Sequence, residues 1–194
     1  MSKVVIKDWE FSDAAFAAPS IQNLLEKQYG PLTIRKSTKE EDIHNNIDYK
    51  INNKSVQWRV QRHENIKGHV GNYGPTFRYS RSFSSHEDRK DSELKKIVRN
   101  MDNGLPYPEH HIWCLVDKNI KIIKFMIVDV NKFVSDFKNE EYEIWYTKLG
   151  KKINNSNTGK IISLRQNYDN SSEFISLNEK YLLPNTIIYK YISN

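Results

Sequence analysis

Three polar side chains that could act on a phosphodiester meet at a hairpin predicted between Ile47 and Arg62. Asp48 stands at the start of the first strand, Asn52-Asn53 makes the turn, and Gln57 and Arg59 lie on the second strand. An acid at the foot of one strand, facing a polar pair on its hairpin partner, is how many nucleases build a divalent metal site. This pattern is typical of a nucleic-acid enzyme or of its inactive relative.

The second strand of this hairpin alternates between apolar and polar residues. Because successive side chains on a strand point to opposite faces, one face should enter the core and the other should stay polar. The predicted core face carries Val56, Trp58 and Val60, and the polar face carries Gln57, Arg59 and Gln61.

Hydrolysis of a phosphodiester needs a hard cation to polarise the phosphate and to activate water. Mg²⁺, or Mn²⁺ in its place, takes oxygen ligands, and Asp48, the Gln57 amide and the Trp58 carbonyl are the candidates. Arg59 would stabilise the negative charge of the transition state. Glu26, from the first predicted helix, would complete the catalytic set.

Around these residues the chain resembles the PD-(D/E)XK superfamily, whose fold is restriction-endonuclease-like. Asp48 followed by Gln57-Trp58-Arg59 stands in the place of the family signature, as in small phage and bacterial members. The resemblance implies a Mg²⁺-dependent endonuclease acting on DNA. The context segments are Glu41-Asp42-Ile43, Thr76-Phe77-Arg78, Ser92-Glu93-Leu94-Lys95-Lys96-Ile97, the strand around Trp113, Ile127-Val128-Asp129-Val130 and Ser171-Ser172-Glu173-Phe174-Ile175.

Two positions depart from the family pattern. Members usually carry lysine where Arg59 stands, and an acid is common where Gln57 stands. Arginine never releases a proton and cannot serve as a base, although it can hold a phosphate. The resemblance therefore supports the fold better than the activity. Alternative registers pair Gln61 with Arg62, or Arg59 with Gln61.

Basic and aromatic residues beyond the hairpin are candidates for DNA contacts. Arg62, Arg78 and Arg81 could bind phosphates, and Tyr79 could stack on a base. Each also has an ordinary interpretation as a surface charge, an ion-pair partner or a packed aromatic residue.

Composition indicates one folded domain over residues 1–194. The formal charge of +6 and the pI of about 9.2 fit a polyanionic partner, although basic surfaces also occur without one. Cys114 is the single cysteine, which excludes a disulfide framework and fits a reducing compartment. No apolar run approaches the length of a membrane span, so we expect a cytoplasmic protein with no membrane partner.

The order of predicted elements is helix, strands, helix, hairpin, helix, strands, which favours an α/β (α+β) fold with a mixed central sheet flanked by helices. Ser12 should cap a helix to about Tyr29, interrupted at Pro19. Residues 37–46 should form a loop or one helical turn. The other expected elements are strands at 32–36, 76–83, 110–116, 120–130, 161–165 and 173–177, a helix capped by Asp91 or Ser92, a helix capped by Asn131, an ambiguous stretch at 140–149 and a tail at 182–191.

Three functions remain open from the sequence. The first is the metal-dependent endonuclease, for which the resemblance also implies a homodimer as a candidate, since restriction-like nucleases often pair to cut both strands. The second is an inactive nuclease-fold protein that binds nucleic acid, which Arg59 favours. The third is a module that inhibits a protein partner.

Overall fold

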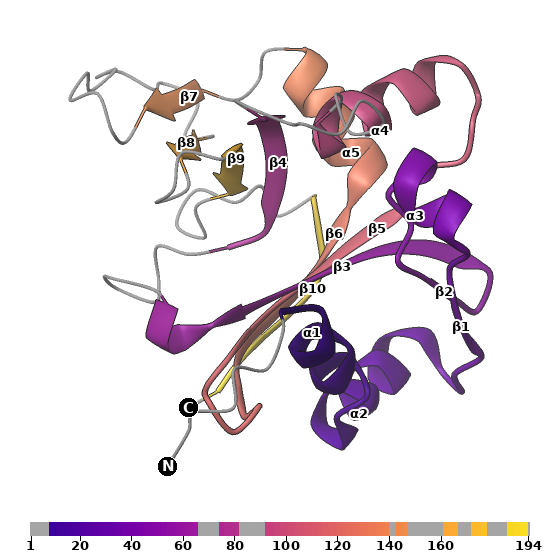
Figure 1. Cartoon of the computed structure of the whole chain (residues 1–194), viewed down its shortest axis with the longest axis vertical. Coiled ribbons are helices and arrows are strands. Elements are labelled where there is room, and N and C mark those ends of the chain that lie inside the picture. The colour runs from indigo at the N-terminus through magenta and orange to yellow at the C-terminus, as the bar shows by residue number, and fades with distance from the viewer. Residues whose placement is uncertain are drawn as a thin grey trace.

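A six-stranded mixed sheet forms the centre of the protein (Figure 1), in a computed structural model that describes residues 8–65, 74–81, 92–139, 143–146, 161–166, 172–177 and 186–193. The strand order is β1-β2-β3-β5-β6-β10. The strands are β1 (Ile34–Lys36), β2 (Tyr49–Ile51), β3 (Lys54–Arg62), β5 (His110–Val116), β6 (Ile122–Asp129) and β10 (Ile187–Ile192). With helices on both faces, this confirms the predicted mixed α+β class.

Strands β3 and β5 run parallel, and the other neighbours in this sheet are antiparallel. Parallel neighbours need a long crossover connection. Here the intervening chain carries β4 (Thr76–Arg81) and α4 (Glu93–Asp102). Strand β4 pairs into a second sheet, of order β4-β9-β8-β7, with β9 (Ser172–Leu177), β8 (Ile161–Gln166) and β7 (Glu143–Tyr146).

Two helices cover one face of the large sheet, α1 (Asp8–Phe16) and α2 (Pro19–Tyr29). Proline fits the first turn of a helix but not its interior, so the predicted single helix is divided at Pro19. The apolar side of β3 faces these helices, since Val56 and Trp58 are buried there and Val60 packs against them. The predicted alternation of this strand is thus confirmed.

The opposite face packs on β4, α4 and α5 (Val130–Lys138), as Figure 1 shows. Its core includes Phe77 and Phe133, whose stacked rings lie 4.5 Å apart. Ser92 caps α4 as predicted, because its hydroxyl accepts the Lys95 N–H. The predicted cap at Asn131 is wrong, since Asp129 caps α5 instead.

The β2–β3 hairpin turns at two asparagines, as predicted. Asn52 and Asn53 have φ values of 46° and 67°. A two-residue turn with positive φ at both positions matches the twist of the flanking strands, and asparagine tolerates it. The pairing of Tyr49 with Val56 then fixes Asp48 just before β2, beside the middle of β3.

Other elements differ from the prediction. Residues 37–46 contain α3 (Lys39–Asn45), begun by a capping box between Thr38 and Glu41. The predicted tail contains β10, and the ambiguous stretch contains β7. Within the described ranges, no helix has both the length and the apolar character needed to cross a membrane.

Candidate functional site

Asp48 is held at the start of the hairpin by its backbone and by its carboxylate. The Ser37 N–H and hydroxyl both donate to the Asp48 carbonyl, at 3.0 and 2.9 Å. Asp48 Oδ2 accepts the Trp58 N–H at 2.7 Å and Arg59 Nη1 at 3.1 Å. The structure therefore brings together Asp48 and Arg59, as the sequence predicted.

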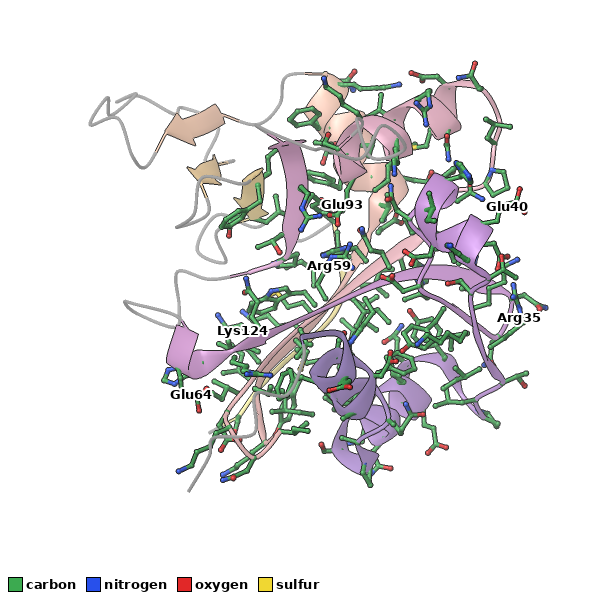
Figure 2. The ribbon with its side chains drawn as sticks, in the orientation of Figure 1. Arg35, Glu40, Arg59, Glu64, Glu93 and Lys124 are labelled. Carbon is green, nitrogen blue, oxygen red and sulfur yellow. The ribbon has the colours of Figure 1, made fainter. Side chains whose placement is uncertain are left out.

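Arg59 lies between two carboxylates. Its Nη1 donates to Asp48, and its Nη2 donates to Glu93 at the start of α4. Figure 2 shows Arg59 and Glu93 together at the centre of the molecule. Glu93 also accepts the Arg78 N–H, at 3.0 Å. The side chain of Glu93 is 9% exposed, that of Asp48 is 22% exposed and that of Arg59 is 33% exposed.

The two carboxylates of this cluster differ in acidity. Burial raises the pKa of Asp48 to about 6, although Arg59 and the Trp58 N–H oppose that rise. Burial also acts to raise the pKa of Glu93, but Arg59 and the Arg78 N–H outweigh it and lower that pKa to about 2. For Arg59, Glu93 and Asp48 outweigh burial and raise the pKa, so its charge is permanent.

Asp48 and Arg59 line an open cavity of about 450 Å³ that lies where α1, β1, α3 and β3 meet. Most of its lining residues carry a charged group or a hydroxyl, although their carbon atoms form the larger part of the exposed wall. One ion pair spans the rim, since Lys36 Nζ lies 2.6 Å from Asp13, which also accepts the Tyr49 hydroxyl. The lining residues are Ser12, Asp13, Lys36, Ser37, Thr38, Lys39, Asp42, Asp48, Tyr49, Trp58 and Arg59.

Gln57 does not reach this cavity. Its side chain is fully buried, and its Oε1 accepts from His111 Nδ1 at 2.7 Å, across the paired strands β3 and β5. Burial lowers the pKa of His111 to about 3, so the ring is neutral, and with the Gln57 oxygen as acceptor its proton lies on Nδ1. The predicted convergence of Asp48 and Gln57 on one pocket is not what the structure shows.

In this structure the predicted oxygen ligands of the metal all take part in other hydrogen bonds. The Trp58 carbonyl accepts Arg59 Nη1 at 2.8 Å, Asp48 Oδ2 accepts two hydrogen bonds, and Gln57 faces His111. In the described part of the chain, no group of three or more acidic, histidine or cysteine side chains could hold a metal ion. The Arg59 guanidinium contacts both the Asp48 carboxylate and the Trp58 carbonyl.

Other predicted residues lie elsewhere. Glu26 is exposed on α2 and does not line the cavity. Arg62 stacks over the Phe11 ring, 3.9 Å from its centroid, and packs on α1. Arg78 is partly buried beside Glu93. The side chains of Tyr79 and Arg81 fall outside the described part of β4.

The sequence prediction missed Glu93 as a member of the site, along with Asp13, Lys36 and Lys39. Ser92-Glu93 was recognisable as a helix start, but its approach to Arg59 depends on the crossover between β3 and β5. Comparison of the chain with protein-family models, curated proteins and solved structures finds no match.

Proposed function

We propose that this chain is a nuclease-like protein that binds nucleic acid at the cavity beside Arg59 and does not cleave it. The proposal combines the PD-(D/E)XK-like hairpin, the net charge of +6 and the geometry of the cavity.

One observation carries the proposal: a permanently charged guanidinium is fixed in the wall of an open polar cavity. Arg59 is one-third exposed there, and Lys36 and Lys39 line the same cavity, together with Asp42, Asp48 and the Lys36 partner Asp13. A guanidinium donates paired hydrogen bonds that match a phosphate, and ammonium groups add charge without strict geometry. Phosphates of a nucleic-acid backbone are the ligands that this arrangement suits.

The same geometry argues against hydrolysis. Arg59 cannot take a proton from water. Gln57, which stands where the family carries an acidic or glutamine ligand, faces the buried His111 instead of the cavity. A site of this kind can hold a backbone phosphate without activating a nucleophile. This supports the binding protein over the enzyme.

Fluorescence anisotropy tests the proposal with labelled double-stranded DNA, single-stranded DNA and RNA of equal length. We expect binding that weakens steeply with added salt, because phosphate contacts release counterions. Absence of binding to all three probes at low salt would overturn the proposal. Salt-insensitive binding to a protein would favour the inhibitor hypothesis.

A second candidate is the Mg²⁺- or Mn²⁺-dependent endonuclease, acting as a homodimer. Asp48 favours it, because this carboxylate lines the cavity and has a pKa of about 6, in the range useful for proton transfer. The test is incubation with supercoiled plasmid and either metal, alongside Asp48→Ala. Metal-dependent nicking by the native chain, lost in the variant, would establish this candidate. Light scattering would measure the oligomeric state.

A further inference from the structure

We propose that Glu93 is a positioning residue that fixes Arg59 in the cavity wall, and that Asp48 is the exchangeable partner that a bound phosphate displaces. This inference rests on the proposed phosphate-binding function and adds a division of labour between the two carboxylates. Both acids contact the same guanidinium, but through different nitrogen atoms and from different elements.

Glu93 is anchored on several sides. Its carboxylate accepts from Arg59 Nη2 and from the Arg78 N–H of β4. Its carbonyl accepts the amide of Asn46, which caps α3, at 3.1 Å. Ser92 caps the helix directly before it. With its side chain only 9% exposed and not lining the cavity, Glu93 cannot move away from Arg59 without breaking contacts to β4.

Asp48 is held less tightly and lies on the cavity side. Its carboxylate lines the cavity and is more than twice as exposed as that of Glu93. Its contact with Arg59 is a single 3.1 Å hydrogen bond to Nη1. A phosphate entering the cavity can take over that nitrogen while Nη2 stays on Glu93. Asp48 would then keep the Trp58 N–H as its partner, at 2.7 Å.

This division predicts opposite effects for two substitutions that each remove one negative charge. Asp48→Asn should tighten binding of a labelled oligonucleotide by about fivefold, because the competing anion is gone; a partly exposed ion pair accounts for a factor of this size. Glu93→Gln should weaken binding by about the same factor, because Arg59 loses its anchor. Glu40→Gln is the matched control, since Glu40 is exposed on α3 and does not line the cavity.

Side-chain NMR of Arg59 gives a readout that does not depend on nucleic acid. In the native chain the Arg59 Nη2–Hη2 signal should be dispersed and protected from exchange, because Nη2 donates to Glu93. In Glu93→Gln it should move to the position and exchange rate of a free arginine, and Glu93→Asp should restore it in part. In Asp48→Asn it should stay protected. Circular dichroism verifies that each variant is folded.

The outcomes separate the two proposals. An unchanged Arg59 signal in Glu93→Gln, or equal effects of Asp48→Asn and Glu93→Gln on affinity, would overturn the positioning role. If no variant binds any oligonucleotide while the NMR pattern follows the prediction, the positioning of Arg59 stands and the nucleic-acid function fails. If Glu93→Gln does not fold, Glu93→Asp replaces it in the NMR test. Its Arg59 signal must then show intermediate protection from exchange, and native-like protection would refute the positioning role of Glu93.

Discussion

Replacing Asp48 by asparagine measures how much the ionised carboxylate in the cavity wall lowers the free energy of unfolding. Burial raises the pKa of Asp48 from 3.8 to about 6 in the folded protein. The folded state therefore holds more protons than the unfolded state between about pH 4 and pH 6, and the free energy of unfolding falls as pH rises through that window. At about 1.4 kcal/mol per pH unit, the whole loss is about 3 kcal/mol.

Asparagine cannot ionise, so the free energy of unfolding of Asp48→Asn should lack the decrease that ionisation of Asp48 causes in the native chain. The difference in unfolding free energy between Asp48→Asn and the native chain should shift by about 3 kcal/mol in favour of the variant between pH 4 and pH 7.5. Urea unfolding followed by tryptophan fluorescence at several pH values gives this difference, with Glu40→Gln as the control of equal charge. Parallel pH profiles for Asp48→Asn and the native chain would refute the reasoning.

Three further substitutions test other parts of the account by urea unfolding at pH 7. Glu93→Ala should cost about 3 kcal/mol, because a mostly buried ion pair loses one partner; a cost near zero would contradict it. Gln57→Leu should cost about 2 kcal/mol, because His111 Nδ1 loses its acceptor, yet leave oligonucleotide affinity unchanged. Phe133→Ala should cost about 4 kcal/mol by opening a cavity under Phe77, and a loss below 1 kcal/mol would contradict that packing.

Local patterns predicted much of the central sheet. The alternation along β3, the double-asparagine turn and the Ser92 cap each depend on residues close in sequence, and all three are confirmed. The capping box of Thr38 and Glu41 was also readable, but the polar composition of that stretch concealed it. The apolar residues of β10 do not indicate a strand locally, because their partner β6 is distant in sequence.

The site could be predicted only in part, because its contacts span distant segments. Asp48 and Arg59 share one hairpin, so their pairing follows from the turn. Glu93 reaches Arg59 from α4, across 34 positions of chain. Gln57 was correctly placed on the polar face of β3. That face, however, is covered by β4 and α4, so its amide meets His111 rather than solvent.

The central claim is that Arg59 contacts a nucleic-acid phosphate, and the salt dependence of binding by Arg59→Gln tests it most directly. Arg35→Gln is the matched control, because Arg35 is an exposed arginine on β1 paired with Glu41 and outside the cavity lining. For double-stranded DNA, the slope of log affinity against log salt should fall by about 1 in Arg59→Gln and remain native in Arg35→Gln. Equal slopes in both variants would contradict the claim.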